Sequence, residues 1–309
     1  MRRPLYRFSP NMRIRTKRSQ FGRSIQRVSM GKKSPKLLTL LGVLLVATVT
    51  IILLIAIPKN HRVQSSQTPG TSVSNFVLTT QVQDMETISE GISEGLISMG
   101  NLPSVAYLHC GPTYSDSSSD SESKELVLLH GARFTKDTWV EANILPTLCQ
   151  SDKSLSVTSV DFPVVSNGSV LKTLFDNLAH AKITSGNPLI IVSPSASGRS
   201  VVGLLGASKD DPTYATTVMN GWIPVACGYI DQAPKEDLQQ INALKLPVLA
   251  IYGNKDPMGK QVSERLKEID ENKNVEVMEM MGGHPVYLDD TETFIDAVIS
   301  FVNQVYHSD

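Results

Sequence analysis

The chain has 309 residues, of which 41% are apolar, 19% charged and 6% aromatic, and these values suit one large folded domain with additional segments rather than three domains. Its three cysteines, Cys110, Cys149 and Cys227, exclude a disulfide-rich scaffold, and their odd number leaves at least one thiol unpaired within the chain. We expect Cys149 and Cys227 to be buried thiols of the core. The net charge of -1 conceals a division, because residues 1–36 contain 12 Lys or Arg and no Asp or Glu.

An apolar run follows this basic segment directly. Residues 37–57 are 21 consecutive residues without a charge, Asn, Gln or Pro. As an α-helix with a rise of about 1.5 Å per residue they would span roughly 30 Å, the thickness of the hydrocarbon core of a bilayer. The run therefore predicts a transmembrane signal-anchor. Lys and Arg are more frequent before it than after it, which predicts a single-pass type II topology with the C-terminal domain in an endomembrane lumen or outside the cell.

Other interpretations of the N-terminal part compete with this anchor. A buried core helix is rarely apolar on every face, and a cleaved signal peptide has a short basic leader and an apolar core of about 7 to 15 residues. An Arg-rich leader without acidic residues is also typical of organelle transit peptides, so organelle targeting is the alternative localisation. Nucleic-acid binding is disfavoured, because the basic run has no interleaved aromatic residues on a fold.

The chain divides into four predicted segments. Residues 1–36 form a basic cytoplasmic segment and residues 37–57 the membrane anchor. Residues 58–75 are rich in Ser, Thr, Gln and Asn, a composition that buries too little apolar surface to fold, and they predict a flexible stalk. Residues 76–309 form the folded domain, in which the Ser- and Asp-rich stretch 114–123 is expected to be a surface loop.

Strand and helix patterns alternate along the folded domain. Such alternation predicts a mostly parallel sheet with helices on both faces. In sheets of this kind, catalytic and binding residues collect in the loops at the carboxyl ends of the strands. We expect strands at residues 73–82, 105–110, 125–129, 156–162, 189–192, 218–226, 248–252 and 275–280, and helices at residues 135–149, 169–183, 198–207, 234–244, 258–269 and 291–306.

Three of these strands end in polar turns. Ser195 follows the strand 189–192 in Ser-Pro-Ser-Ala-Ser-Gly, Asp256 follows the strand 248–252 in Gly-Asn-Lys-Asp-Pro, and His284 follows the last strand in Gly-Gly-His-Pro. Taken singly, each residue could be an ordinary turn or surface residue. In chain order they give Ser, Asp and His, which is the order of the catalytic triad in the α/β-hydrolase fold.

The flanking residues select one serine among the three of that turn. A nucleophile on a sharp turn from strand to helix requires small residues two positions before and two after it. Ser195 has Ser193 and Ser197 at these positions, whereas Ser197 would have Arg199 and Ser193 would have Ile191. The sequence therefore predicts Ser195 as the nucleophile, although serines stand where glycines are usual.

The remaining catalytic groups follow from the chemistry of acyl transfer. A serine hydroxyl is a weak nucleophile, so we expect His284 to take the proton of Ser195 while Asp256 fixes the imidazole tautomer. The developing oxyanion needs backbone N–H donors, usually one from the residue after the nucleophile and one from the loop after an earlier strand. Ala196 and Ala132 are the predicted donors of this oxyanion hole. His130, at the start of the same loop, is expected to orient it.

Four sequence segments resemble the α/β-hydrolase-domain-containing protein 14 family over roughly residues 125–305: LVLLHGARF, IIVSPSASGRS, LAIYGNKDPMG and GGHPVYLD. The Ser-Pro-Ser elbow of that family also lacks the flanking glycines. The resemblance implies an α/β-hydrolase fold and a serine hydrolase that uses Ser195, Asp256 and His284, and one member type similarly carries an N-terminal membrane anchor. The family is associated with short-chain ester hydrolysis and with transfer of acetyl groups from protein lysines to coenzyme A.

The spacing also bears on the size of the substrate. Only 19 residues lie between Cys227 and Pro247, before the strand that leads to the acid. Because no large lid domain fits into this interval, we expect a minimal lid and a shallow site for a small acyl group. A bulky or macromolecular remainder of the substrate would then stay outside.

These observations favour a serine hydrolase that cleaves acetyl or short-chain esters, thioesters or amides through an acyl-enzyme. The alternatives are an acyltransferase or protein-lysine deacetylase with coenzyme A as acceptor, and a catalytically silent binding module. The expected partners are a small acyl substrate or an acylated protein and, through residues 37–57, a membrane, but no nucleic acid. No motif has metal-ligand spacing. The sequon Asn167-Gly168-Ser169 is usable for glycosylation if the domain is luminal.

Overall fold

The computed structural model describes residues 91–112, 114, 123–164 and 167–307. In this part of the chain an eight-stranded sheet has the order β1-β2-β4-β3-β5-β6-β7-β8. The strands are β1 Ser93–Met99, β2 Leu102–Cys110, β3 Lys124–Leu128, β4 Leu155–Val160, β5 Leu189–Pro194, β6 Met219–Val225, β7 Val248–Gly253 and β8 Val275–Met280. The predicted strand 73–82 lies outside the described residues.

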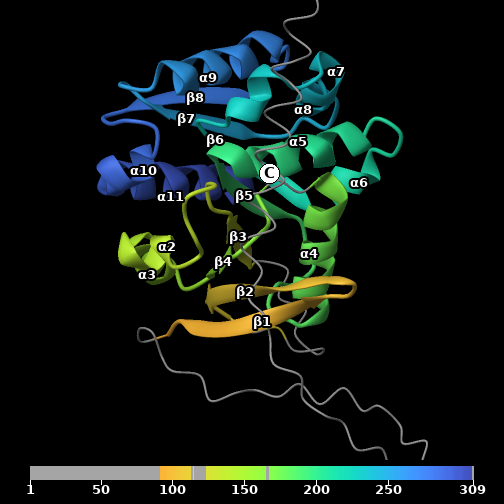
Figure 1. Cartoon of the computed structure of the whole chain (residues 1–309), viewed down its shortest axis with the longest axis vertical. Helices are drawn as coiled ribbons and strands as arrows, with labels where there is room; N and C mark the ends of the chain where they lie inside the picture. The colour runs from red at the N-terminus through yellow and green to blue at the C-terminus, as the bar shows by residue number, and fades with distance from the viewer. Residues whose placement is uncertain (1–90, 113, 115–122, 165–166, 308–309) are drawn as a thin grey trace, which may run out of the picture. The chain divides into compact units, whose positions relative to one another are not determined.

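Helices cover both faces of this sheet (Figure 1). They are α2 Thr138–Glu141, α3 Ile144–Ser151, α4 Gly168–His180, α5 Gly198–Ala207, α6 Thr213–Thr216, α7 Lys235–Leu238, α8 Gln240–Ala243, α9 Pro257–Ile269, α10 Val286–Asp289 and α11 Thr291–His307, with short 3₁₀ turns η1 Ser195–Ser197 and η2 Gly228–Asp231. The pairings β4-β3, β3-β5, β5-β6, β6-β7 and β7-β8 are parallel, and β2 pairs antiparallel with both β1 and β4. The predicted mostly parallel sheet with helices on both faces is confirmed.

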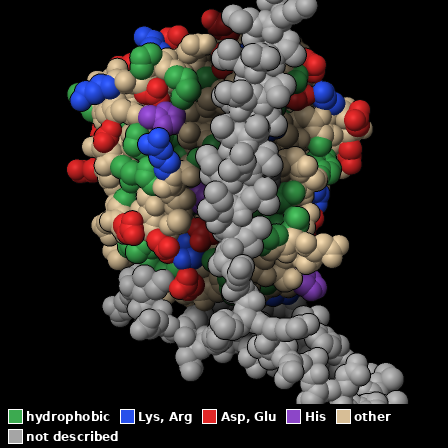
Figure 2. Space-filling model, viewed as in Figure 1, with side chains coloured by type: hydrophobic (Ala, Val, Ile, Leu, Met, Phe, Trp, Pro, Cys, Tyr) green, Lys and Arg blue, Asp and Glu red, His purple; other side chains and the backbone are tan. Residues whose placement is uncertain are grey.

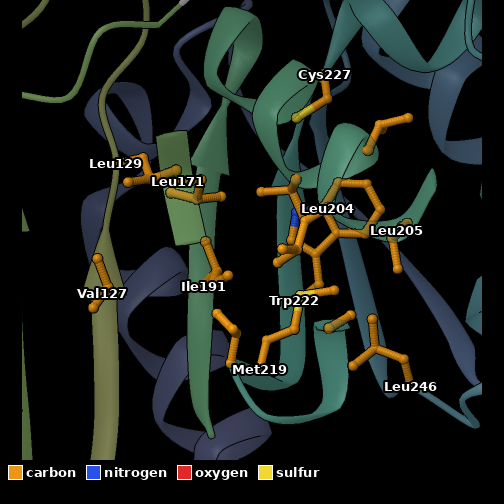
Figure 3. Packing of buried hydrophobic residues seen from close by; sticks show 14 of the residues in the cluster. Val127, Leu129, Leu171, Ile191, Leu204, Leu205, Met219, Trp222, Cys227 and Leu246 are labelled. Carbon is orange, nitrogen blue, oxygen red and sulfur yellow. The ribbon is translucent and has the colours of Figure 1, made fainter. Parts of the chain in front are cut away.

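The core consists of two apolar layers, one on each face of the sheet. Every residue of β4, β5 and β7 is buried, as expected for parallel strands covered on both faces. One layer receives side chains from α4, α5 and α9, and the other from α3 and α11. Figure 3 shows Trp222 of β6 among Leu204, Leu205, Met219 and Leu246 in the first layer.

The edge hairpin contains a strand that the sequence pattern did not predict. Strand β1 lies at the edge of the sheet and pairs only with β2 among the described strands. Its outer side chains, such as Leu96, are exposed. A two-residue turn at Gly100 and Asn101 joins the two strands, and Gly100 has a φ of 67°, a backbone conformation that favours glycine at the first turn position. This Gly-Asn pair is the one sequence signal for the hairpin.

The predicted helix 135–149 is wrong in its continuity, because the structure has two helices there. Asn143 adopts a left-handed backbone conformation with a φ of 57°, which ends α2 and begins α3. Pro146 lies in the first turn of α3, where a missing N–H removes no intrahelical hydrogen bond. The predicted helix 234–244 is likewise two short helices, α7 and α8.

The cysteines differ from expectation at one position. Cys149 of α3 forms a disulfide with Cys110 at the end of β2, with the two Cα atoms 6.0 Å apart. The sequence predicted a buried thiol at Cys149, and this prediction is wrong because Cys149 is disulfide-bonded. Nothing local relates the two residues, which are 39 positions apart, and they meet because β2 and α3 both lie against β4. The expectation for Cys227 is confirmed, because it is a free, buried cysteine.

No helix formed by the described residues is both long enough and apolar enough to cross a membrane. The predicted basic segment, anchor and stalk, residues 1–75, lie outside the described residues.

We predict that replacing Cys149 by Ser lowers the free energy of unfolding by about 2–4 kcal/mol, because a disulfide restricts the unfolded chain. Urea denaturation of the full chain in detergent, followed by intrinsic fluorescence, measures the change. Reductant should reproduce the loss in the wild type and have little effect on C149S. Equal unfolding midpoints of the oxidised wild type and C149S would contradict the prediction.

Candidate active site

The predicted site residues meet at the carboxyl edge of the parallel strands. Ser195 follows β5, Asp256 follows β7, and His284 follows β8, while the predicted oxyanion loop follows β3. In the sheet β3 lies beside β5, and β7 lies beside β8. Sequentially distant turns are thereby brought to one end of the sheet.

The turn that carries Ser195 is sharp. Its φ is 53°, in the left-handed region that residues with a Cβ rarely adopt. The chain leaves β5 at Pro194 and begins the helical turn η1 at Ser195 itself. This strained position between a strand and a helix holds the hydroxyl at the tip of the turn.

The small residues around Ser195 have specific partners. The buried Ser193 hydroxyl accepts a hydrogen bond from Trp222 Nε1 at 2.7 Å, and its carbonyl accepts one from Cys227 Sγ at 2.7 Å. The Ser197 hydroxyl donates to the carbonyl of Pro194 at 2.8 Å. The two serines that replace the usual glycines are thus small enough for the turn and leave no hydroxyl unsatisfied.

Close packing beside the turn requires a glycine at position 198. A Cβ added to Gly198 would lie 2.3 Å from Cys227 Sγ, which is far inside van der Waals contact. Burial raises the pKa of the Cys227 thiol to about 12, so this cysteine is not a competing thiolate nucleophile at neutral pH. The sequence did not predict that Trp222 and Cys227 contact this turn. Trp222 lies on β6 and Cys227 just after it, and they come near the turn because β6 pairs with β5 in the sheet.

The three predicted triad side chains are hydrogen-bonded in series. Asp256 Oδ2 lies 2.7 Å from His284 Nδ1, and His284 Nε2 lies 2.9 Å from Ser195 Oγ. This geometry suits the tautomer in which Nδ1 donates to the carboxylate, which only accepts when ionised, and Nε2 accepts from the serine hydroxyl. Asp256 is buried just before the first residue of α9, where the helix dipole favours a negative charge.

The turns that carry Asp256 and His284 are tied to each other. Lys255 N–H donates to the carbonyl of Gly282 at 2.8 Å, and Gly282 N–H donates to Asn254 Oδ1 at 3.2 Å. A Cβ on Gly253 would lie 2.2 Å from the carbonyl oxygen of Gly283. The glycines are therefore required for the close approach of the two turns, which sets the spacing of Asp256 and His284.

The predicted oxyanion loop lies against the nucleophile. A Cβ built on Gly131 would lie 3.7 Å from Ser195 Cβ. The Ala132 N–H has no hydrogen-bond partner in the described part of the chain, so it is available to a ligand. His130 Nδ1 lies 2.9 Å from the carbonyl oxygen of Gly131, in line with the expected role in orienting the loop. Ala196, the other predicted donor, is the second residue of η1, directly after Ser195.

A second set of contacts fixes the far end of this loop. The Lys136 N–H donates to Asp161 Oδ1 at 2.7 Å. The buried Lys136 ammonium contacts Glu94 Oε1 at 2.8 Å and Asp137 Oδ1 at 2.7 Å. Three carboxylates, one of them on Asp161 directly after β4, thus hold the far end of the loop in place.

A cavity of about 460 Å³ opens beside Ser195 and His284. Its aromatic wall includes Phe134 and Tyr287, whose ring centroids are 6.1 Å apart, and Trp139 stacks behind Tyr287 at 4.8 Å. Burial raises the pKa of Tyr287, so its hydroxyl stays protonated at neutral pH. The residues lining the cavity are Gly131, Ala132, Arg133, Phe134, Pro194, Ser195, Val225, His284, Pro285 and Tyr287.

The sequence predicted that Ser195 and His284 share one site, but it did not predict the walls of this cavity. Tyr287 stands three positions after His284 in the Gly-Gly-His-Pro-Val-Tyr segment, and Arg133 and Phe134 follow the predicted donor Ala132. Their nearness in sequence to the predicted groups was the available signal. Residues 228–246 form η2, α7 and α8, with no inserted lid domain. Within the described ranges no three His, Cys, Asp or Glu side chains are grouped as metal ligands.

Comparison with known proteins gives a consistent set of relatives. No family model matches the chain. ABHD14B of Homo sapiens, described as a candidate protein-lysine deacylase, is 29% identical over 193 residues, which are 57% of this chain and 82% of that protein. ABHD14A of Danio rerio is 24% identical over 281 residues, covering 87% of this chain and 97% of that protein. The chain is a homologue of the ABHD14 proteins.

Solved structures identify the fold of this ABHD14 homologue. A CIB-like hydrolase from Thermoplasma acidophilum matches with a TM-score of 0.52 and 20% identity, over 69% of this chain and 98% of that one. The fluorophosphonate-binding serine hydrolase F of Staphylococcus aureus matches with a TM-score of 0.51 and 14% identity, over the same shares of each chain. The ABHD14 homologue has the α/β-hydrolase fold, and its relatives and structural neighbours together support an enzyme of the α/β-hydrolase class.

The positive φ of Ser195 leads to a stability prediction for the ABHD14 homologue. Ser195→Gly and Ser195→Ala both remove the hydroxyl, but only alanine retains the Cβ that makes a left-handed conformation unfavourable. We expect the glycine variant to be more stable by about 1 kcal/mol. Thermal unfolding of the two variants measures the difference.

A matched pair at Ser197 provides the control. Ser197 has an ordinary helical φ of -67°, so its alanine variant should be the more stable of the two, because glycine has the larger unfolded-state entropy. The same order of stability at both positions would contradict a strained turn at Ser195.

Proposed function

We propose that this ABHD14 homologue is a serine hydrolase that cleaves small acyl esters, thioesters or amides through an acyl-enzyme on Ser195. The observation that carries the proposal is the hydrogen-bonded series from Asp256 to His284 to Ser195, with the serine on a strained turn beside an open cavity. A binding module would have no use for this arrangement of three polar groups. The described geometry therefore favours catalysis over the silent alternative.

The proposed reaction begins with attack by Ser195 Oγ on the acyl carbonyl carbon. Its proton moves to His284 Nε2, and the buried carboxylate of Asp256 stabilises the imidazolium that forms. The carbonyl oxygen becomes an oxyanion, for which Ala132 and Ala196 would provide backbone N–H donors. The histidine then gives its proton to the leaving alkoxide, thiolate or amine, which departs and leaves the acyl group on the serine.

The second half regenerates the free serine. A water molecule or a thiol gives its proton to His284 and attacks the acyl carbonyl, so the acyl group leaves as an acid or as a new thioester. Coenzyme A is the thiol that we propose as the alternative acceptor. Release of the product returns the proton from His284 to Ser195.

The open site supports an acylated protein as a candidate substrate. Residues 228–246 add no lid domain above the cavity, so an acylated lysine on a protein could reach Ser195 with its carrier outside. ABHD14B carries protein-lysine deacylase in its name, and we propose the same substrate class for this chain. In Figure 2 the charged side chains of the described residues are scattered over the visible face rather than gathered into one patch.

The triad leads to a direct kinetic test with 4-nitrophenyl acetate and the full chain in detergent. Ser195→Ala, His284→Gln and Asp256→Asn should each lower kcat by about 10³-fold or more, because each removes a group that acts in the transition state. KM should change far less. Added coenzyme A should increase the rate only if the thiol is the acceptor.

The control for these variants is Asp176→Asn, the same chemical change as Asp256→Asn at an exposed carboxylate of α4 that pairs with Lys172. It should leave kcat unchanged. If the triad variants retain wild-type turnover, or the wild type neither turns over the ester nor reacts with a fluorophosphonate probe at Ser195, the binding module becomes the better proposal.

We further propose the single-pass type II topology, with residues 37–57 as anchor and the catalytic domain luminal or extracellular. The Cys110–Cys149 disulfide supports this placement, because disulfides persist mainly in oxidising compartments. The sequon at Asn167 is exposed at the beginning of α4. Targeting to another organelle is the alternative.

A glycan at Asn167 would report this topology, since N-linked glycans are added in the lumen of the endoplasmic reticulum. We expect treatment with N-glycosidase to increase the mobility of the chain from eukaryotic cells. Ser169→Ala should abolish the shift while retaining Asn167 Oδ1, which accepts from Val170 N–H at the helix start. Digestion of the catalytic domain by protease in sealed microsomes would contradict the topology.

A further inference from the structure

The cavity beside Ser195 contains one formal cation. Arg133 lines it, and the other lining residues include no further Arg or Lys. No Asp or Glu belongs to the lining residues. The electrostatic character of the cavity therefore depends on Arg133 and on whether another side chain neutralises it.

The acidic side chains near the oxyanion loop already have partners. Glu94 and Asp137 contact the Lys136 ammonium at 2.8 and 2.7 Å, and Asp161 accepts the Lys136 N–H at 2.7 Å. Arg133 has no hydrogen bond or ion pair with any described residue. Within the described ranges no carboxylate therefore pairs with the guanidinium of this exposed residue, and its N–H donors can bind a ligand.

A second residue with a hydrogen-bond donor belongs to the wall of this cavity. Tyr287 lines the cavity, and its hydroxyl has no hydrogen-bond partner within the described ranges. The hydroxyl remains protonated, so it can donate a hydrogen bond to an anion. Its ring is held in place by Trp139 and Phe134, which makes Tyr287 a rigid wall residue.

We propose, on the basis of the hydrolase function proposed above, that Arg133 and Tyr287 form a subsite for a carboxylate at the far end of the acyl group. The preferred substrates would be half-esters, half-thioesters or half-amides of short dicarboxylic acids. A guanidinium fork binds a carboxylate through two parallel hydrogen bonds, and a phenol adds a third. The cavity of about 460 Å³ offers more room than an acetyl group fills.

The proposal places the anion on the acyl group rather than on the leaving group. Arg133 directly follows Ala132, whose N–H is the predicted donor to the acyl carbonyl oxygen. A carboxylate three methylene groups from that carbonyl is of suitable length to reach a side chain on the same loop. The macromolecular or alcohol part would leave through the open side of the site.

The test compares two esters of matched shape, monomethyl glutarate and methyl 5-methylhexanoate, with the full chain in detergent. We expect the wild type to have the higher kcat/KM for the glutarate. Arg133→Gln should lower the ratio of the charged to the neutral substrate by about 10- to 100-fold, and Arg133→Lys by less, because lysine retains the charge but not the fork. Tyr287→Phe should lower the ratio several-fold.

The control is Lys153→Gln, which removes one positive charge at an exposed position between α3 and β4 and should leave the ratio unchanged. A ratio near one in the wild type, or a ratio unaffected by R133Q, would overturn the subsite. Turnover of the neutral ester that depends on Ser195 tests the hydrolase function separately, so the two failures are distinguishable. A third arm compares acetyl-coenzyme A with acetyl-N-acetylcysteamine. If R133Q weakens only the turnover of the former, the anion belongs to the leaving group and the acyl assignment is overturned.

Discussion

The left-handed backbone of Ser195 is the constraint on which the rest of the site depends. A non-glycine residue at a φ of 53° is unfavourable by roughly 1 kcal/mol or more, so the surroundings must hold the turn in place. Burial of β5 between the two apolar layers provides this support. The hydrogen bonds of Ser193 with Trp222 and Cys227 also fix the carboxyl end of β5.

The two sides of the site are held by separate sets of interactions. Hydrogen bonds between the turns after β7 and β8, one between backbone groups and one to the Asn254 side chain, fix the distance from Asp256 to His284. On the other side of β5, Lys136 and its three acidic contacts hold the oxyanion loop. Glu94 belongs to β1, so the edge hairpin of β1 and β2 helps to hold this loop. The hairpin is linked to α3 through the Cys110–Cys149 disulfide. It lies at the opposite edge of the sheet from β8, the strand that precedes His284. The turn at Ser195 is contacted from both sides, and Phe134 and Tyr287 also join them directly.

Patterns that are local in sequence predicted most of the parallel sheet and the meeting of Ser195, Asp256 and His284. Apolar runs gave β3 to β8, and the rule of small flanking residues selected Ser195, because both depend on a few neighbouring positions. The pairing of Cys110 with Cys149 was not predictable, since it results from the positions of β2 and α3 around β4. Strand β1 was missed because its exposed edge requires no strong apolar alternation. The break at Asn143 was missed because apolar residues recur on both sides of it.

The same limit explains why the walls of the cavity were missed. Tyr287 has the spacing of a core residue, and its stacking with Trp139 shows that it is largely one. Its proposed role in binding a carboxylate depends also on Arg133. That residue belongs to the loop after β3, more than 150 positions earlier in the chain. Sequence pattern separates buried from exposed positions, but it does not indicate that two loops share a cavity.

The position of Arg133 also relates substrate binding to the chemistry of the site. Arg133 follows Ala132 directly in the chain, so its positive charge lies on the loop that is proposed to stabilise the oxyanion. A carboxylate in the proposed subsite would neutralise much of this charge before the oxyanion forms. Its attraction to Arg133 is present in the bound substrate and in the transition state alike, and uniform stabilisation of this kind lowers KM more than it raises kcat. The backbone donors, which are aimed at the oxyanion and not at the carboxylate, would then have to provide the stabilisation that is specific to the transition state.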